Sequence, residues 1–251
     1  MKNMKINIAS DYHDMSRQAA ERFYDKLKAD PSVHFGLATG GTPIGMYRHL
    51  NELLTSSPLK TDALKTFNLD EYIGLAPSDP NSFYSFMNEH VYDPWNLQAD
   101  QCFIPDGNAV DLEKECARYE AMIDQYGIDV QLLGVGKNGH IGFNEPGTRF
   151  DSLTQVVELK PSTRKANARF FPSMDDVPTH ALTMGIGSIL KAKEIVLIAS
   201  GEAKAEAVYS LVHREQTEDW PITALQQHRN VTVIVDEAAG RLIETKRGHS
   251  S

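Results

Sequence analysis

The fold is decided by residues 33–54, VHFGLATGGTPIGMYRHLNELL. The apolar run Val33–Ala38 predicts a buried strand, and Ile44–Leu54 has the apolar spacing of a helix. The loop between them contains two glycines, then Thr42, a good N-cap, and Pro43, which suits the first position of a helix. A strand, a Gly-rich loop and a helix in this order indicate an α/β fold.

Strands and helices alternate in the same way along the rest of the chain. Further strands are expected at Lys5–Ala9, Thr66–Leu69, Val130–Val135, Glu194–Ala199 and Val231–Val235. Further helices are expected after the N-cap candidates Ser10 and Asp11 and at Ser82–Val91, Leu112–Tyr126 and Glu202–Val212. The pattern predicts a single domain over residues 1–251, with a mostly parallel, doubly wound, Rossmann-like sheet covered by helices on both faces. Ligands of such folds bind beyond the carboxyl ends of the strands, so the loops after strands are the informative ones.

Composition limits the partners and the compartment. The chain has 251 residues, 41% of them hydrophobic, and a formal net charge of -9, which disfavours nucleic acid and anionic membranes as partners. The most apolar stretch, Ile195–Ala199, is too short to span a bilayer. Cys102 and Cys116 are too few for a disulfide framework, and the N-terminus shows no apolar targeting segment. We therefore expect a cytoplasmic protein with free thiols.

Two adjacent acids follow the strand expected at Thr66–Leu69. In an extended chain, Asp70 and Glu71 would point to opposite sides, one inward and one outward. An inward Asp70 is a candidate general base. The alternative is that Asp70 caps the next turn.

The loop Gly134–Gly147, GVGKNGHIGFNEPG, follows another expected strand. It places His140 five residues before Glu145, and a carboxylate can orient an imidazole and raise its pKa, as a proton shuttle requires. A metal site is the rival interpretation, but the loop has no HExxH motif, no second histidine and no cysteine. The loop therefore favours acid–base chemistry, with no metal.

Two features could together bind a phosphate. The loop at residues 39–43 presents a helix N-terminus to a ligand, although it matches neither a Walker loop nor a dinucleotide fingerprint. An acidic protein also needs local cations, and the candidates are Arg164, Lys165, Arg169 and Lys204. Each of these cations could equally be solvated surface charge.

Seven segments resemble the glucosamine-6-phosphate deaminase family, in the family's order and over nearly the whole chain. They are Leu37–Pro43, Phe67–Gly74, Ser82–Asn88, Gly134–Gly147, Thr163–Phe171, Ala181–Gly187 and Ile222–His228. The resemblance implies conversion of glucosamine 6-phosphate and water into fructose 6-phosphate and ammonia, by aldose–ketose isomerisation coupled to loss of the amine. It also implies that the reaction uses no metal and no organic cofactor.

The resemblance assigns roles to individual residues. Asp70 matches the base that moves a proton between C2 and C1, His140 matches the imidazole that opens the pyranose ring, and Glu145 matches the carboxylate that supports it. Asn138, which completes the catalytic set, stands where many members carry Asp, so Glu145 is expected to be the main anionic partner of His140. The residues matched to phosphate binding are Thr39, Gly40, Gly41, Thr42, Arg169 and Lys204.

Two more expectations follow from the resemblance. Residues 147–176 are expected to form a mobile lid, because they join the catalytic loop to a phosphate ligand. Gln155 stands where the hexameric, allosterically activated branch carries an effector-binding Arg. We therefore expect a monomer or small homo-oligomer that N-acetylglucosamine 6-phosphate does not activate.

Three alternatives remain open. A galactosamine-6-phosphate enzyme would share these motifs, which do not report the configuration at C4. A 6-phosphogluconolactonase shares the broad fold, but has no need of a carboxylate poised at C2, so Asp70 speaks against it. A sugar-phosphate-sensing domain could keep the phosphate loop and lose the catalytic groups, yet Asp70, His140 and Glu145 are all present.

Overall fold

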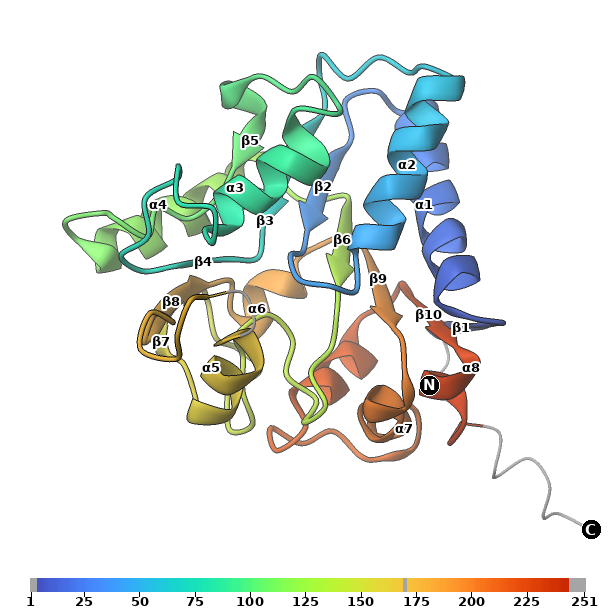
Figure 1. The fold of residues 1–251 in the computed structure, drawn as a ribbon. Coiled ribbons are helices and arrows are strands. Elements are labelled where there is room, and N and C mark those ends of the chain that lie inside the picture. Colours follow the sequence, from blue (N-terminus) through green and yellow to red (C-terminus); the bar gives the residue numbers. More distant parts are fainter. Residues whose placement is uncertain (1–3, 169–170, 244–251) are drawn as a thin grey trace, which may run out of the picture.

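The main body of the molecule is a seven-stranded parallel sheet (Figure 1), seen in a computed structural model that describes residues 4–168 and 171–243. The strand order is β1-β10-β9-β6-β2-β3-β5, and every neighbouring pair in it is parallel. The strands are β1 (Met4–Ala9), β2 (His34–Leu37), β3 (Lys65–Asn68), β5 (Cys102–Phe103), β6 (Val130–Leu133), β9 (Glu194–Ala199) and β10 (Val231–Asp236). The predicted mostly parallel α/β architecture is confirmed.

The strand order contains a topological switch point. From β2 the chain adds β3 and β5 on one side, and it then returns to add β6, β9 and β10 on the other side, so β2 and β6 lie next to each other at the reversal. The loops after β2 and β6 are the two Gly-rich loops that the sequence singled out. Both therefore open into the crevice where ligands of such sheets bind.

Helices flank this sheet in two groups that lie apart in Figure 1. In one group α1 (Tyr12–Ala29) packs against α2 (Ile44–Ser56), and in the other α7 (Ala205–His213) packs against α8 (Glu237–Gly240) and the 3₁₀ turn η5 (Pro221–Gln227). Asp11 caps α1, as predicted, by accepting a hydrogen bond from the backbone N–H of Asp14 at 2.8 Å. Every residue of β9 and β10 is buried, as expected for strands covered on both faces.

A second, smaller sheet was not predicted. It is antiparallel, with the order β4-β8-β7, and consists of β4 (Asp70–Tyr72), β7 (Gln155–Glu158) and β8 (His180–Thr183). The chain passes from the large sheet to the small one at Leu69, whose N–H donates to Leu37 and whose carbonyl accepts from Met184. Asp70 consequently lies at the junction of the two sheets.

Some predicted boundaries were wrong. Thr42 is not an N-cap: residues 41–43 form a turn, and α2 begins at Ile44, with Pro43 in the cap position and no side-chain cap. The helix expected at Ser82–Val91 is instead α3 (Phe83–Met87), followed by the π-helical segment η1 (Asn88–Tyr92).

The remaining helical elements differ in length. The segment before α7 is a 3₁₀ turn, η4 (Glu202–Lys204), and not the first turn of an α-helix. The longest of the others is α4, and the set consists of η2 (Ala99–Gln101), α4 (Leu112–Tyr126), α5 (Pro161–Asn167) and α6 (Ile186–Ile189). None of the helices formed by residues 4–168 and 171–243 is both long enough and apolar enough to cross a membrane.

Candidate active site

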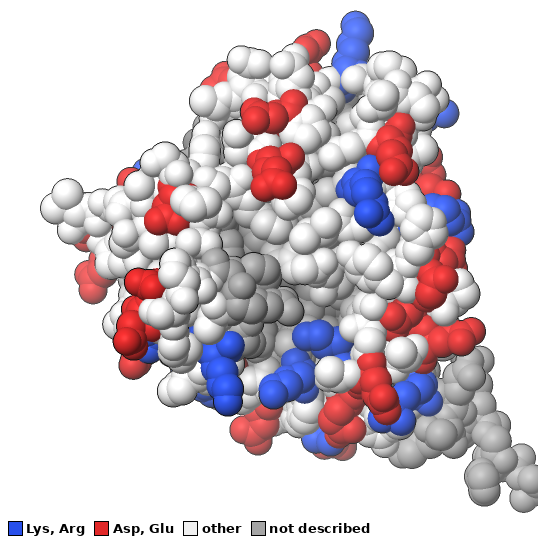
Figure 2. Space-filling model, in the orientation of Figure 1, with Lys and Arg blue, Asp and Glu red and all other residues white. Residues whose placement is uncertain are grey.

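A cavity of about 640 Å³ opens at the switch point of the sheet. The loops after β2, β3 and β6 line it, together with the start of α3, part of α5 and the turn η4. Its volume falls in the range of small-molecule sites. Figure 2 shows Lys and Arg side chains gathered along the lower margin of the hollow in this face, although the chain as a whole is acidic. Two of the lining residues are Lys137 and Lys204.

The loop after β2 contributes Thr39, Gly40, Gly41 and Thr42, the residues predicted to bind phosphate, to the wall of the cavity. Gly40 has φ of 92°, a left-handed backbone conformation that favours glycine. Among the described residues, none accepts a hydrogen bond from the N–H groups of residues 40–42. These donors are therefore open to an anion in the cavity.

Tyr12, which the sequence did not single out, supports this loop from behind. Its hydroxyl accepts a hydrogen bond from the N–H of Gly45 at 2.9 Å and lies 3.2 and 3.1 Å from the carbonyl oxygens of Gly41 and Thr42. Tyr12 thus ties the start of α1 to the loop. No local pattern indicated this contact, because its partners are 29 to 33 residues away along the chain.

The predicted cations have different positions. Lys204 lies at the end of η4 and lines the cavity. Arg164 instead donates to the backbone carbonyls of Met174 and Val177, so it braces its own segment and does not face the site. Lys165 is exposed and is not among the lining residues. Arg169 lies outside the described residues.

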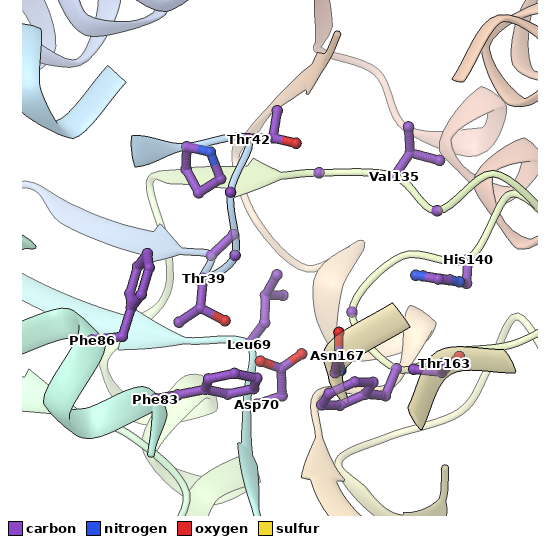
Figure 3. Close-up of a pocket in the computed structure, with 18 of the residues that line it drawn as sticks. Thr39, Thr42, Leu69, Asp70, Phe83, Phe86, Val135, His140, Thr163 and Asn167 are labelled. Carbon is purple, nitrogen blue, oxygen red and sulfur yellow. The ribbon is translucent and has the colours of Figure 1, made fainter. Parts of the chain in front are cut away.

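Asp70 points into the cavity from β4 (Figure 3). Its side chain is buried, and no residue in the described ranges donates a hydrogen bond to it. Burial, with a further contribution from the neighbouring Glu71 charge, raises the pKa of Asp70 to about 8. A carboxyl group with a pKa near working pH and no partner is suited to exchange a proton with a ligand.

Glu71 corrects two of the expectations for this strand end. It does not point outward to solvent, since it is only 4% exposed. Its carboxylate accepts hydrogen bonds from the backbone N–H groups of Tyr72, Phe83 and Tyr84, so Glu71, and not Asp70, binds the start of α3. This leaves Asp70 available to the cavity.

His140 and Asn138 line the cavity from the loop after β6. Asn138 Oδ1 lies 2.7 Å from His140 Nδ1, and Asn138 Nδ2 donates to Glu145 Oε2 at 2.7 Å. Since the carboxylate can only accept, the amide nitrogen of Asn138 must face Glu145 and its oxygen must face His140. His140 Nδ1 is therefore the protonated nitrogen in the neutral ring, and Nε2 is free to act as a base.

The position of Glu145 refines the prediction that it is the anionic partner of His140. Its Oε1 lies 3.6 Å from His140 Nδ1, beyond hydrogen-bond range, and Glu145 itself does not line the cavity. Burial lowers the pKa of His140; the Glu145 charge opposes this, whereas Lys204 and Lys160 add to it. Glu145 is thus linked to His140 by hydrogen bonds through Asn138, while its charge also acts on the ring directly.

Two polar side chains of α5 that belong to the site were not predicted from the sequence. Thr163 Oγ1 donates to Glu145 Oε1 at 2.5 Å, and Asn167 Nδ2 donates to the Tyr72 hydroxyl at 2.8 Å. Thr163 and Asn167 are four residues apart, so they lie on one face of the helix, and both line the cavity. The spacing of the two residues is the signal in the sequence that could have indicated this polar face.

The cavity also has an aromatic wall, which was not predicted from the sequence. Tyr72, Phe83 and Phe143 pack with ring centroids 4.5 to 6.0 Å apart, and Phe171 meets Tyr72 at 5.8 Å. All four line the cavity. The wall makes part of the lining apolar in the same cavity into which the buried Asp70 points.

Two further observations concern metals and thiols. Within residues 4–168 and 171–243, no group of three or more His, Cys, Asp or Glu side chains could hold a metal ion. Cys102 and Cys116 are free thiols, as expected.

Comparison with known proteins gives a consistent picture. The family model described as glucosamine-6-phosphate isomerases/6-phosphogluconolactonase matches residues 10–234. The chain is 50% identical over 237 residues to the glucosamine-6-phosphate deaminase of Halalkalibacterium halodurans, covering 94% of this chain and 96% of that protein. It is also 50% identical over 240 residues to glucosamine-6-phosphate deaminase 1 of Bacillus subtilis, covering 95% and 99%.

Solved structures extend the comparison. The structure of a monomeric glucosamine-6-phosphate deaminase superposes with a TM-score of 0.93 at 50% identity, covering 95% of this chain and all (100%) of that one. The 6-phosphogluconolactonase of Trypanosoma brucei superposes with a TM-score of 0.73 at 19% identity, covering 95% and 98%. At that identity the lactonase likeness concerns the fold alone.

Proposed function

Because the chain belongs to the glucosamine-6-phosphate isomerase/6-phosphogluconolactonase family, we infer that it is a glucosamine-6-phosphate deaminase. It converts glucosamine 6-phosphate and water into fructose 6-phosphate and ammonia, as part of amino-sugar catabolism. The observation that carries the site assignment is that Asp70, a carboxylate with no hydrogen-bond donor among the described residues, and an oriented imidazole, His140, line one cavity. The roles given below to individual residues are proposals that rest on this geometry.

The first step is opening of the pyranose ring. His140 Nε2 takes the proton of the C1 hydroxyl and returns a proton to the ring oxygen, which gives the open-chain aldehyde. Asn138 holds the ring in the tautomer that leaves Nε2 unprotonated, and Glu145 holds Asn138. In this scheme His140 is catalytic, whereas Asn138 and Glu145 position it.

The second step is proton transfer along the open chain. Asp70 removes the C2 proton and delivers it to C1, while the C1 oxygen takes up a proton that the ammonium group at C2 gives up, so that the C1 carbonyl becomes a hydroxymethyl group and C2 becomes a protonated imine. Water then hydrolyses the imine to the ketone and releases ammonia. A cationic amine at C2, bound beside Asp70, favours the carboxylate form and so prepares the base.

The phosphate anchors the substrate away from the reacting carbons. Residues 40–42 and Lys204 line the cavity, and backbone N–H groups and an ammonium group are donors that suit a phosphate dianion. This binding energy fixes the position of C1 and C2 without taking part in bond changes.

Residues 147–176 form the proposed lid. Its outer strand, β7, is fixed by pairing with β8, whereas Ser162, Thr163, Asn167 and Phe171 line the cavity. We expect amide hydrogen exchange in α5 to slow when fructose 6-phosphate is added. Exchange in α5 as slow as in β9 before any ligand is present would contradict a moving lid.

The quaternary structure and the compartment are also part of the proposal. Gln155 forms a long contact, 3.4 Å, to Asn144 in the catalytic loop, and carries no charge that could hold an anionic effector. Together with the monomeric relative, this supports an enzyme that works as a monomer without an effector. The free thiols support a cytoplasmic setting.

The decisive experiment measures ammonia and fructose 6-phosphate released from glucosamine 6-phosphate. The unmodified protein should release equal amounts of both with a hyperbolic dependence on substrate, unchanged by N-acetylglucosamine 6-phosphate. Asp70→Asn and His140→Gln should each lower kcat by about 10²–10⁴-fold, the usual contribution of a positioned acid–base group. If the unmodified protein binds the sugar phosphate and releases neither product, galactosamine 6-phosphate is the next substrate to test, and a sensing domain becomes the alternative.

A further inference from the structure

The buried hydroxyl of Thr163 is the feature of the site whose role is least obvious. Thr163 lies on α5, far along the chain from the catalytic loop, and is only 8% exposed. A carboxylate can only accept hydrogen bonds, so the hydroxyl proton of Thr163 must be directed at Glu145 Oε1, 2.5 Å away. This is the shortest hydrogen bond made to the Glu145 side chain by a described residue.

The two oxygens of Glu145 have separate partners. Oε2 accepts from Asn138 at 2.7 Å, and Oε1 accepts from Thr163. Oε1 is also the oxygen that lies 3.6 Å from His140 Nδ1. A small rotation of the carboxylate would therefore bring Oε1 into direct contact with the imidazole and displace the Asn138 oxygen.

Direct pairing would change the chemistry of His140. Asn138 is neutral, so it orients the ring without favouring the charged form. A carboxylate in direct contact favours the imidazolium, in which Nε2 carries a proton and cannot act as a base. The other charged groups that act on His140, Lys204 and Lys160, oppose that charge, so the outcome depends on where Oε1 is held.

We propose that Thr163 is a positioning residue for ring opening: its hydroxyl holds Glu145 away from His140, so that the contact passes through Asn138 and the imidazole stays a neutral base. The proposal rests on the deaminase function inferred above, and adds to it a residue from a different element, α5. The position of α5 is therefore part of the arrangement of His140, Asn138 and Glu145 that opens the ring.

The test is Thr163→Val, which keeps the shape of the side chain and removes the hydroxyl, with Thr163→Ser as the matched control. We expect kcat with glucosamine 6-phosphate to fall about 10- to 100-fold in the valine variant, the size of one lost hydrogen bond to a charged group. The serine variant should stay within about threefold of the unmodified protein. Thermal unfolding checks that both variants fold.

Two readouts separate positioning from mere packing. The inhibition constant of 2-amino-2-deoxyglucitol 6-phosphate, an acyclic analogue that needs no ring opening, should change by less than about threefold in the valine variant. The pKa of His140, followed by NMR of its ring Cε1–H and assigned by loss of the signal in His140→Gln, should rise in the valine variant and not in the serine variant.

Three outcomes would overturn the proposal. They are an unchanged kcat in Thr163→Val, a loss of kcat with an unchanged pKa of His140, and a loss in which the acyclic analogue binds weaker by the same factor. If the unmodified protein released no ammonia, the deaminase assignment would fail. The NMR titration would still decide, on its own, whether Thr163 controls the charge of His140.

Discussion

Asp70 and Glu145 are both buried carboxylates of one site, but their surroundings are opposite. Asp70 reaches the cavity from the small sheet, beside the aromatic wall, and no described residue donates a hydrogen bond to it. Glu145 lies behind the cavity wall, where Asn138 and Thr163 each donate a hydrogen bond to it. One carboxylate has been left for the substrate, and the other is held by the protein.

The difference shows how one fold gives two carboxylates two roles. Desolvation without a partner raises the pKa of Asp70 to about 8, so its proton can be gained and lost near neutrality. Hydrogen-bond donors on both oxygens fix the Glu145 side chain in place. Asp70 is thus suited to move a proton, and Glu145 to orient the residues that do.

The largest expected effect that tests this contrast concerns stability. Asp70→Asn removes a buried group that must ionise at a cost, so the variant should be more stable than the unmodified protein. The folded pKa, about 8, lies above the unfolded value near 3.8, so the unmodified protein loses stability as the pH rises between these values. At pH 7 the gain in free energy of unfolding should be on the order of 4 kcal/mol, measured by urea denaturation.

The pH dependence of that gain is the sharper measurement. The difference in unfolding free energy between Asp70→Asn and the unmodified protein should grow by about 1.4 kcal/mol per pH unit above pH 4 and level off near pH 8. Glu145→Gln is the contrasting control, because it removes a carboxylate that two donors stabilise, and it should lower stability. A gain for Asp70→Asn that does not change with pH would mean that Asp70 is not kept neutral by burial.

The fold was predictable where the sequence pattern is continuous. The apolar runs at β2, β9 and β10 are long enough to mark buried parallel strands, and Asp11 is a strong capping residue. The small sheet was not predicted because its first strand, β4, has only three residues and follows β3 after a single residue, Leu69. In the sequence, β3 and β4 therefore look like one continuous strand. The pairing of β4 with β8 depends on contacts about 110 residues apart, which no local pattern reports.

The site was predictable to a similar degree. Asp70, Asn138, His140 and Lys204 all reach the cavity, because motifs in loops after strands converge at the switch point. The hydrogen-bond partners within the site could not be predicted. Glu71 accepts from the N–H groups at the start of α3. Side chains from other elements support the site by further hydrogen bonds, namely Thr163, Asn167 and Tyr12. Those contacts depend on tertiary packing and not on local sequence.

The smallest expected effect concerns the charge next to Asp70. Glu71 raises the pKa of Asp70 through its charge, so Glu71→Gln, which keeps an oxygen acceptor for the N–H groups at the start of α3, should lower that pKa. A larger fraction of Asp70 is then ionised at pH 7, so kcat/KM should rise about threefold there, and its acidic limb should move by about half a pH unit to lower pH. The measurement is kcat/KM for ammonia release between pH 6 and 9 in both proteins.

The difference between the pH profiles of Glu71→Gln and the unmodified protein reports the change in the pKa of Asp70. The amine of the substrate also titrates in this range, but it contributes equally to both profiles, so only the difference between them reports on the enzyme. Glu89→Gln provides the control, since it removes one negative charge from an exposed position on η1. If the limb moved equally in Glu71→Gln and Glu89→Gln, net charge would be the cause. If it moved to higher pH in Glu71→Gln alone, the loss of the contacts to α3 would outweigh the loss of charge, and the position of Asp70, more than its neighbour's charge, would set its pKa.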